Sequence, residues 1–600
     1  MLIGTIGELI KQQAIRFPNE IAIGAPDRSP LSYSGLCQIS LEMGEKLNSL
    51  GLGRNDRLAI VLPNSPEMAV AFLSISSFAT SAPLNPAYRQ SEFEYYLTDL
   101  NVSAIIVQSD RESVVRDVAQ NLNIPLLELI PAYSLPSGSF SIHGEARTSP
   151  SKIGMAESDD VALVLHTSGT TSKPKIVPLK HRNLIASAQN IQRSLSLTQK
   201  DRCLNVMPLF HIHGLMASIL ATITSAASVI CTPGFYASQF FEWLADHEPT
   251  WYTAVPTMHQ AVLARASENQ SILDQIQLRF IRSCSASLPP QVMAELERVF
   301  HAPVVEAYGM TEASHQMTCN PQPPGQRKPG SVGMPTGVEV AIMVEDNDEV
   351  LSMEEVGEIV IRGPNVMDGY ANNPEANQNA FSHGWFRTGD QGYLDSDGYL
   401  FITGRIKEII NRGGEKISPR EIDELLLEHP QVLQAVTFAM PDPNLGEDVA
   451  AAVVLKDESI TENGLRRFVN EHLAYFKVPK RIIILDEIPK GPTGKLQRIG
   501  LAEKLGITGE QPVDPESEVT FIAPRDPVEE ALASIWCEVL NLQRVGVMHH
   551  FLTVGGDSLL ALQLVSRIRE KLDVEISLLD FFEAPSIAEQ AEIVQDKLLQ

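Results

Sequence analysis

Short apolar runs alternate with longer segments of helical period through the first 400 residues. Residues 57–63 (RLAIVLP) form an apolar run of strand length, and residues 65–80 (SPEMAVAFLSISSFAT) follow at the length of a helix. The same succession recurs at 103–109 and 112–122, and again at 162–168 and 181–195. Continuous apolar strands between helices are typical of largely parallel sheets that are buried on both faces. The pattern predicts a large α/β domain over residues 1–404.

The pattern changes after residue 404. A helix-period segment at 421–430 (EIDELLLEHP), an apolar run at 449–456 (VAAAVVLK) and a second helix-period segment at 462–473 predict a smaller α+β domain over residues 405–505. Residues 506–523 are rich in Gly, Pro, Glu and Asp and read as a linker. Three amphipathic segments then predict an all-α helical bundle over residues 524–600. The chain is therefore expected to be multidomain.

Several features indicate a cytoplasmic protein. The N-terminal segment mixes charged residues into its apolar positions, unlike a signal peptide. Residues 215–231 approach the length of a membrane span, yet serines and threonines interrupt them, so a buried helix followed by a strand is expected. The six cysteines are scattered without a CxxC pair, which favours reduced thiols.

The charge balance argues against a nucleic-acid partner. The formal net charge is −27, whereas a phosphate backbone is held by clustered Lys and Arg. The last 95 residues hold 17 acidic and 6 basic side chains. Such a surface suits docking onto basic patches of partner proteins or a plain role in solubility, and the sequence leaves both open.

The segment LHTSGTTSKPK, residues 165–175, has the composition of a phosphate-binding loop. Its glycine frees backbone amides, its hydroxyls can surround phosphate oxygens, and Lys173 and Lys175 add positive charge. A P-loop is disfavoured because Pro174, rather than Ser or Thr, follows Lys173. By itself the segment also fits an ordinary Ser/Thr turn.

Further segments give this loop a context: EAYGMTEA (306–313), the run WFRTGDQGYL…NRGGEKISPREID (385–423) and PKGPTGKLQR (489–498). Together with the loop they resemble the adenylate-forming superfamily of acyl-CoA synthetases, luciferases and non-ribosomal peptide adenylation domains, over residues 1 to about 505. The segments PLFHIHGL, RFIRSCSASLPP and MTEASHQM look most like oxalyl-CoA synthetases. The resemblance implies an ATP-dependent acid–thiol ligase that releases AMP and pyrophosphate.

The resemblance also implies roles for individual residues. The β- and γ-phosphates of ATP would be held by Thr167, Ser168, Gly169, Thr170, Thr171 and Lys175. Glu312 would bind Mg²⁺ and Thr311 the α-phosphate. Tyr308 would lie against the adenine beside the backbone of Ser285, Ala286 and Ser287. Asp390 would bind the ribose hydroxyls, with Arg405 beside it.

Catalysis in this superfamily is alignment and charge cancellation, because a carboxylate is already a nucleophile at neutral pH. Lys495 would reach the carboxylate and the α-phosphate oxygens. Lys407 matches the hinge position about which the small domain rotates before the thiol arrives, and Gly413 and Gly414 would line the thiol's approach. His211 matches the gate between the acid pocket and that approach, although a lone histidine is also an ordinary core residue.

The C-terminal segment VGGDSLLALQL resembles the attachment motif of peptidyl or aryl carrier domains. Ser558 would then receive 4′-phosphopantetheine from a phosphopantetheinyl transferase, at a helix N-terminus that favours phosphate. Such a serine also serves as a plain N-cap. A tethered arm raises the local thiol concentration to roughly millimolar, so the chain is expected to load its own carrier domain.

The acid is expected to be small and to lack an α-amino group. Amino-acid adenylation domains place an aspartate where this chain reads FHIHG. By similarity to oxalyl-CoA synthetases, His213, Ser285 and His315 could meet a second carboxylate, unless both histidines only satisfy core hydrogen bonds.

Two departures from the common TTGKPKG stand out: Ser172 and Ile176 replace glycines, and Ile does not readily adopt a positive φ. The loop's mobility is therefore questioned.

Three functions stay open. The first is activation of a non-amino acid and transfer to the chain's own carrier domain, supplying a downstream synthase or condensing enzyme of a nonribosomal peptide or polyketide type. The second is an acyl-CoA ligase for a small acid such as oxalate, with free CoA as the acceptor. The third is a catalytically silent docking module.

Overall fold

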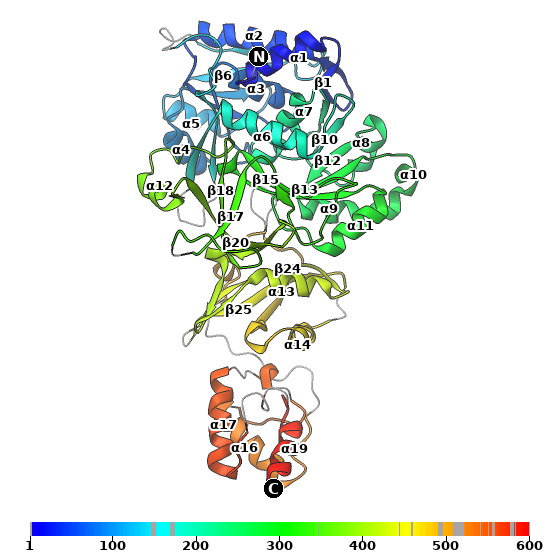
Figure 1. Cartoon of the computed structure of the whole chain (residues 1–600), viewed down its shortest axis with the longest axis vertical. Helices are drawn as coiled ribbons and strands as arrows, with labels where there is room; N and C mark the ends of the chain where they lie inside the picture. The colour runs from blue at the N-terminus through cyan, green and yellow to red at the C-terminus, as the bar shows by residue number, and fades with distance from the viewer. Residues whose placement is uncertain are drawn as a thin grey trace. The chain divides into compact units, whose positions relative to one another are not determined.

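The computed structural model describes residues 3–145, 152–167, 174–345, 347–442, 445–457, 460–489, 496–507, 521–540, 542–549, 551–554, 558–576, 581 and 584–598 (Figure 1). The chain divides into compact units. The first comprises Met1–Lys407 and Lys490–Leu496, and the second comprises Glu408–Pro489 and Gln497–Gln600.

A largely parallel sheet occupies the N-terminal part of the first unit. Its seven described strands lie in the order β7-β6-β5-β3-β4-β8-β9, with antiparallel pairs only at its two ends. Helices follow the strands as the alternation of the sequence predicts. The strands are β3 (Arg57–Val61), β4 (Thr80–Pro83), β5 (Ala104–Gln108), β6 (Leu126–Pro131), β7 (Phe140–His143), β8 (Val161–Thr167) and β9 (Lys175–Lys180); the helices are α3 (Pro66–Ser76), α4 (Gln90–Leu100), α5 (Val115–Asn121) and α6 (His181–Ser194).

A second sheet of nine described strands has the order β16-β15-β14-β13-β12-β10-β11-β1-β2, and its centre is parallel. Its strands are β1 (Ile21–Ala25), β2 (Arg28–Ser32), β10 (Arg202–Asn205), β11 (Ser228–Cys231), β12 (Trp251–Ala254), β13 (Phe280–Cys284), β14 (Val304–Met310), β15 (His315–Cys319) and β16 (Met334–Pro335). Its accompanying helices include α1 (Ile6–Arg16), α2 (Tyr33–Ser49), α7 (Ala221–Thr224), α8 (Phe240–His247), α9 (Pro256–Leu263), η2 (Ala266–Asn269), α10 (Gln270–Leu273) and α11 (Pro290–Phe300).

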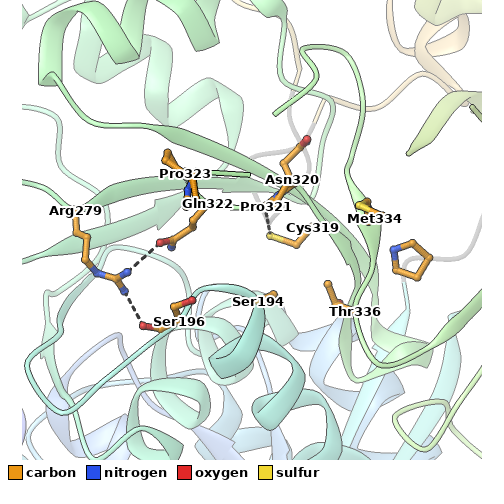
Figure 2. A pocket seen from close by; sticks show the side chains of 12 residues that line it. Ser194, Ser196, Arg279, Cys319, Asn320, Pro321, Gln322, Pro323, Met334 and Thr336 are labelled. Atoms are coloured by element: carbon orange, nitrogen blue, oxygen red, sulfur yellow. Dashed lines mark hydrogen bonds between the residues drawn. The ribbon is translucent and has the colours of Figure 1, made fainter. Parts of the chain in front are cut away.

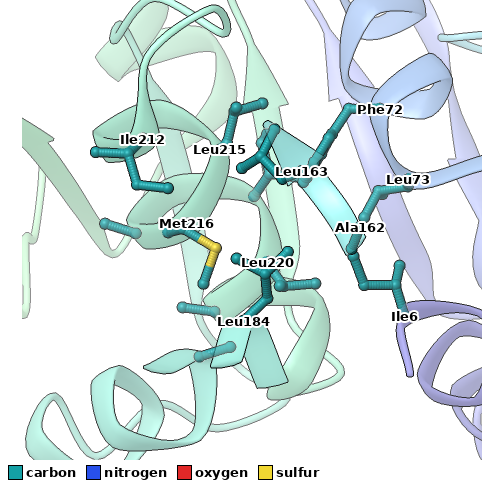
Figure 3. Packing of buried hydrophobic residues seen from close by; sticks show 14 of the residues in the cluster. Ile6, Phe72, Leu73, Ala162, Leu163, Leu184, Ile212, Leu215, Met216 and Leu220 are labelled. Carbon is teal, nitrogen blue, oxygen red and sulfur yellow. The ribbon is translucent and has the colours of Figure 1, made fainter. Parts of the chain in front are cut away.

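Helices packed between the two sheets form the main core. Helix α3 contacts β3 and β4 of the first sheet and β1 and β11 of the second, and α6 likewise contacts strands of both. All eleven residues of α3 are buried, which explains why its sequence is apolar on every side. Ser65 caps this helix by accepting a hydrogen bond from the Met68 amide at 3.1 Å, and Pro66 occupies its first turn. Figure 3 shows Phe72 and Leu73 of α3 near Leu163 of β8 and Leu215 beyond it.

The apolar stretch at residues 215–231 is buried, as expected, and contains a helix and then strand β11. Its helix differs from the expected α-helix, since His213–Leu220 form a π-helix, η1, that continues into α7. Among the described helices, none combines the length and the apolar character that crossing a membrane requires. All six cysteines are free thiols, and four of them are buried.

A third, antiparallel sheet completes the first unit and supplies Asp390 and Arg405 to the site. Its described strands are β17 (Glu339–Met343), β18 (Gly357–Arg362), β19 (Phe381–Ser382), β20 (Trp385–Leu394) and β21 (Leu400–Arg405). Helix α12 (Pro374–Ala380) precedes β19, and the short helix η4 (Ile406–Glu408) follows β21.

The second unit contains two separate hydrophobic cores, an α+β one and an all-α one. The α+β part has the described strand order β23-β22-β25-β24, with β26 beside β25. Its elements are β22 (Ile410–Arg412), β23 (Glu415–Ile417), α13 (Pro419–Glu428), β24 (Val432–Asp442), β25 (Gly446–Leu455), α14 (Glu462–His472), η5 (Tyr475–Lys477), β26 (Arg481–Ile484) and α15 (Leu501–Lys504).

The all-α part confirms the predicted helical bundle. It contains α16 (Pro527–Leu540), η6 (Phe551–Val554), α17 (Ser558–Leu572) and α19 (Ile587–Leu598). Trp536 is fully buried against Phe551, with ring centroids 5.4 Å apart, and its indole nitrogen donates to Gln590 Oε1 at 3.0 Å. Most of the expected linker, residues 508–520, lies outside the described residues.

Candidate active site

Several of the predicted nucleotide-binding residues of the first unit lie at the carboxyl ends of parallel strands. Ser285–Ser287 directly follow β13, and Tyr308 lies near the carboxyl end of the neighbouring β14. The short helix η3 (Thr311–Ala313) follows β14 and carries Thr311 and Glu312. Ligands of open α/β sheets bind at this edge, because loops there converge from several strands.

The carboxylate of Asp390 bonds directly to two other predicted nucleotide-binding residues. The Tyr308 hydroxyl donates to Asp390 Oδ2 at 2.5 Å, and the Arg405 guanidinium lies 3.0 Å from Asp390 Oδ1. Asp390 and Arg405 are also paired across β20 and β21. Burial and the Asp390 carboxylate raise the pKa of Tyr308 well above its ordinary value, so its hydroxyl stays a donor. The arrangement holds the Asp390 carboxylate, which is 4 % exposed, in a fixed orientation.

A second cluster is built around Glu312. Its Oε1 accepts a hydrogen bond from the Tyr370 hydroxyl at 2.9 Å, and the ammonium group of Lys175 lies 4.5 Å from the centre of the Tyr370 ring. Burial raises the pKa of Glu312, while Arg405 and Lys175 act in the opposite direction. Desolvation lowers the pKa of Lys175, and Lys407 adds to that effect. Lys175, Glu312 and Arg405 therefore share one electrostatic environment.

Sequence reasoning did not identify Tyr370. It stands 58 residues after Glu312, in a segment without a cluster of charged or catalytic residue types. Nothing local in the chain distinguishes it, because its importance comes from contacts with residues far away in the sequence.

Thr167 and Lys175 face each other across β8 and β9 and so delimit the predicted phosphate loop. Ser168, Gly169, Thr170, Thr171, Ser172 and Lys173 lie outside the described residues. Ile176 corrects one expectation: it is a buried residue of β9, paired with His166, and is not among the residues with positive φ. A side chain at position 176 therefore imposes no backbone strain.

The backbone around the site is strained at three residues. Ser285, Ser314 and His315 have φ angles of 76°, 50° and 98°, in the left-handed region that L-residues rarely adopt. Gly309 allows β15 to approach β14 there, since a Cβ atom at this position would lie 1.7 Å from the His315 carbonyl oxygen. Such strain of about 1–3 kcal/mol per residue gathers at functional sites.

The comparisons with known proteins agree with this geometry. Residues 10–371, more than half of the chain, match the family of AMP-binding enzymes. The chain belongs to this family. Residues 421–495 match the C-terminal domain of the AMP-binding enzymes, and residues 530–594 match the phosphopantetheine attachment site. The chain is thus an adenylate-forming acid–thiol ligase with a carrier domain, as its motifs imply.

Curated relatives of this AMP-binding enzyme include CoA ligases for small acids. It is 44 % identical to the oxalate–CoA ligase of Arabidopsis thaliana over 505 residues, which cover 82 % of this chain and 97 % of the relative. It is 45 % identical to the oxalate–CoA ligase of Saccharomyces cerevisiae, over 75 % of this chain and 87 % of the relative. The sulfoacetate–CoA ligase of Cupriavidus necator is 36 % identical, over 83 % and 97 %.

Among solved structures, ATP-bound MatB from Rhodopseudomonas palustris is similar, with a TM-score of 0.75 and 27 % identity over 83 % of this chain and 99 % of MatB. The acyl-adenylate complex of the o-succinylbenzoate CoA synthetase of Bacillus subtilis has a TM-score of 0.70 and 28 % identity, over 82 % and 96 %. This AMP-binding enzyme therefore has the adenylate-forming fold.

The structure brings together the three residues predicted for the acid pocket. His213 begins the π-helix η1, a rare element that is frequent at functional sites. Its Nδ1 lies 3.0 Å from Ser285 Oγ, and its ring stacks on that of His315 with centroids 5.0 Å apart. His211, the predicted gate, is half-buried two residues earlier, and its Nδ1 accepts from the His213 amide at 3.3 Å.

Arg282 completes this group, and sequence reasoning missed it. Its guanidinium is fully buried and lies 3.3 Å from both His213 Nε2 and His315 Nε2. The signal was present in the chain, because Arg282 interrupts the apolar strand RFIRSC, and arginine is rarely buried without a specific partner.

The remaining predicted residues follow Arg405 in the chain. Lys407 lies in η4 at the end of the first unit, and Gly413 and Gly414 form the turn between β22 and β23 with φ angles of 59° and 103°. Lys495 lies outside the described residues. Ser558 is the first residue of the fifteen-residue helix α17.

Arg498, three residues after Lys495, is anchored in the α+β core. Its guanidinium lies 2.6 Å from Asp423 Oδ2 and 3.2 Å from Glu408 Oε2, and it donates to the Thr437 carbonyl oxygen at 2.9 Å. Glu408 directly follows Lys407 in the chain. These ion pairs connect the position after the predicted hinge to the segment that carries Lys495.

A cavity of about 530 Å³ lies at the other end of β13 from Ser285 (Figure 2). Arg279, which precedes β13, lines it and donates to Gln322 Oε1 at 3.0 Å. None of the predicted nucleotide-binding residues lines this cavity. It is therefore separate from the nucleotide and acid sites.

The donor set around Glu312 fits Mg²⁺. Magnesium is commonly held by one or two carboxylates together with the phosphates of the substrate. The described chain contains no cluster of three or more His, Cys, Asp or Glu side chains that could hold a metal alone, so Glu312 would share the ion with ATP.

Replacing Glu312 with glutamine is expected to separate stability from activity. Because burial raises the pKa of Glu312, the folded wild type loses stability as the pH rises from about 4.5 through that raised pKa. The glutamine variant lacks this loss and should unfold at a higher temperature at neutral pH. Its Mg²⁺-dependent ATP–pyrophosphate exchange should fall by about 10- to 100-fold. Thermal unfolding at acid and neutral pH and exchange assays check both effects.

Glu67→Gln is the matched control. Glu67 is also buried, at 3 % exposed, but pairs with Arg28 far from the site. This variant should lose stability and keep exchange activity. A Glu312→Gln protein that is less stable than wild type at neutral pH would contradict the interpretation.

Proposed function

We propose that this chain activates a small non-amino carboxylic acid with ATP and transfers the acyl group to the thiol carried at Ser558 of its own carrier domain. The main support is that one chain contains both an adenylation site and a carrier domain. The first unit assembles the Tyr308–Asp390–Arg405 and Glu312–Tyr370–Lys175 groups, and the C-terminal part matches the phosphopantetheine attachment site.

In the first half-reaction, Asp390 would accept hydrogen bonds from the ribose hydroxyls, with Arg405 and Tyr308 fixing its carboxylate. Lys175 and the loop after Thr167 would hold the β- and γ-phosphates. Glu312 would bind Mg²⁺, which supplies charge neutralisation at the phosphates. An oxygen of the acid's carboxylate attacks the α-phosphorus, and pyrophosphate leaves with the electrons of the broken P–O bond.

Lys495 would neutralise the negative charge that develops where the carboxylate meets the α-phosphate, with Thr311 bonding the same phosphate. Rotation about Lys407 would then replace Lys495 by a path for the thiol past His211, Gly413 and Gly414. The thiolate attacks the acyl carbon, and AMP leaves.

Ser558 fits the attachment role because it begins a long helix, whose N-terminal amides favour a phosphodiester. The carrier domain implies a phosphopantetheinyl transferase as a partner. A downstream synthase or condensing enzyme would consume the loaded acyl group.

The second candidate is an acyl-CoA ligase for a small acid such as oxalate. Two relatives named oxalate–CoA ligase, at 44 % and 45 % identity, favour it. Free CoA would then replace the carrier as acceptor. A silent docking module is opposed by the hydrogen bonds that orient two carboxylates of the site, from Tyr308 to Asp390 and from Tyr370 to Glu312.

The test is ATP–pyrophosphate exchange with the holoenzyme across short mono- and dicarboxylates, with oxalate included and α-amino acids as the matched comparison. We expect exchange with at least one short acid and none with amino acids, since no carboxylate stands at the position that would hold an ammonium group. Intact-mass analysis with ATP and the active acid should then show acylation without added CoA. Absence of exchange with every acid would overturn the proposal.

A further inference from the structure

Arg282 is an unusual buried cation. It lies in the middle of β13, its side chain is fully buried, and it bonds only to neutral groups in the described part of the chain. Its Nε has no hydrogen-bond partner among the described residues. A buried charge is normally paired with an opposite one, because removing it from water is costly. The missing countercharge suggests that an anion completes this site.

The hydrogen bonds of Arg282 define the proton positions on His213. A guanidinium can only donate, so the Arg282 Nη1 hydrogen points to Thr253 Oγ1 and His213 Nε2, each 3.3 Å away. Because the Arg282 hydrogen directed at Nε2 leaves no place for a proton there, Thr253 Oγ1 donates its own hydrogen to His213 Nε2 at 2.6 Å. Nε2 is thus an acceptor, and the proton of the neutral ring lies on Nδ1. That proton is donated to Ser285 Oγ at 3.0 Å.

His315 is held in the same way. The Nη2 group of Arg282 lies 3.3 Å from His315 Nε2 and donates to Gln316 Oε1 at 3.0 Å. The orientation of the Gln316 amide is fixed because its nitrogen donates to Ser194 Oγ at 2.8 Å and to Thr336 Oγ1 at 3.2 Å. Ser194 and Thr336 line the cavity in Figure 2. The fork of Arg282 therefore faces the Nε2 atoms of both histidines at once.

We infer that Arg282 is a positioning residue for the acid substrate and holds His213 and His315 as Nδ1–H tautomers. Because His213 Nδ1 donates to Ser285 Oγ, the hydroxyl hydrogen of Ser285 points away from His213. Ser285 can then donate this hydrogen to a second anionic group of the acid. This inference rests on the proposed function and narrows it to acids with two anionic groups. Ser285 accepts from His213, so its own hydrogen is available to a ligand oxygen. The buried charge of Arg282 strengthens that donor through Thr253 and His213, since polarised hydrogen bonds reinforce one another in a low dielectric.

The inference predicts a selective effect on the acid. In Arg282→Gln, the KM for a short dicarboxylate should rise about 10- to 100-fold, as expected for losing hydrogen bonds to a charged group, while the KM for ATP stays unchanged. The rise should be smaller for the matching monocarboxylate. Arg282→Lys keeps the positive charge but lacks a guanidinium that can face both histidines, so its KM for the dicarboxylate should lie between those of the wild type and Arg282→Gln. The measurement is steady-state exchange with each substrate varied.

A spectroscopic readout separates positioning from simple structural damage. Histidine-selective ¹⁵N labelling distinguishes Nδ1–H from Nε2–H tautomers, and the His213 signals are assigned by their loss in His213→Asn. The wild type should show the Nδ1–H tautomer, and Arg282→Gln should lose this uniformity. Thr253→Val removes the intermediate hydroxyl with little change in volume and should raise the dicarboxylate KM about 2- to 10-fold. This variant decides the question if Arg282→Gln fails to fold.

Arg279→Gln is the matched control, because Arg279 precedes the same strand but pairs with Asp201. It should keep the wild-type KM for the acid. A folded Arg282→Gln protein with wild-type dicarboxylate KM, or wild-type His213 in the Nε2–H tautomer, would overturn the inference. The tautomer is measurable without turnover. An enzyme that exchanges with no acid would therefore refute the proposed function and leave the role of Arg282 to be judged by the spectrum.

Discussion

Replacing Lys495 with alanine should lower the rate of acyl-adenylate formation by about 10²- to 10³-fold, the usual effect of removing one preorganised charge-stabilising donor. The carboxylate and the α-phosphate are both anionic, and their approach concentrates negative charge in the transition state. No general base is needed, so removal of the neutralising ammonium group removes the main contribution of a side chain to this step. The measurement is ATP–pyrophosphate exchange at saturating acid and ATP.

The second half-reaction provides the internal comparison. Acyl transfer from chemically prepared acyl-AMP to the carrier thiol should keep a near wild-type rate in Lys495→Ala, because Lys495 serves only adenylation in the proposed cycle. Lys504→Ala, which alters a nearby exposed lysine that donates to Gln497 Oε1, should leave both rates unchanged. Equal losses in both half-reactions would contradict the division of labour that we propose.

Replacing Ser558 with alanine should abolish self-loading completely while adenylation continues. Without the hydroxyl, a phosphopantetheinyl transferase has no acceptor, so the protein gains no mass on incubation with that enzyme and CoA. Exchange of ATP and pyrophosphate should be unaffected, because the residues proposed for adenylation lie outside the carrier domain. Intact-mass analysis before and after incubation with ATP and the acid gives a direct readout.

Ser586→Ala controls for the role of serine as a helix cap. Ser586 accepts a hydrogen bond from the Glu589 amide at 3.3 Å at the start of α19, in the same helical bundle. Its loss should destabilise the bundle by about 1 kcal/mol and leave the mass gain intact. Rapid formation of acyl-CoA by Ser558→Ala would instead favour the free CoA ligase over the self-loading enzyme.

The fold was largely predictable because its strands and helices have strong local patterns. The run at 57–63 became β3, the segment at 65–80 became α3, and the three C-terminal amphipathic segments became α16, α17 and α19. The π-helical form of η1 was not predictable from residue periodicity, since η1 packs against strands of the second sheet and against α3 and α6, which are tertiary contacts. The concern about a positive φ at Ile176 was wrong, because this residue is paired with His166 in a strand, and that pairing is a tertiary contact.

The candidate site was predictable only where its residues lie in recognisable motifs. Tyr308, Glu312 and Asp390 stand in such motifs, and the fold brings Tyr308 and Asp390 into direct contact. Tyr370 and Arg282 act through contacts made across the fold, and a single sequence does not contain these pairings. For Arg282 a charged residue inside an apolar strand is a usable clue, whereas Tyr370 offers none.

The ion pairs of Arg498 have a mechanical consequence. Arg498 is the third residue after Lys495, so the connecting backbone spans at most about 10 Å. The Arg498 guanidinium also forms an ion pair with Glu408, which directly follows the proposed pivot Lys407. The ammonium group of Lys495 is thus kept within a short distance of the segment that begins immediately after the pivot. A rotation that admits the sulfur nucleophile would therefore move the ammonium group of Lys495 away in the same movement. Adenylation and thiol transfer could then not take place at the same time.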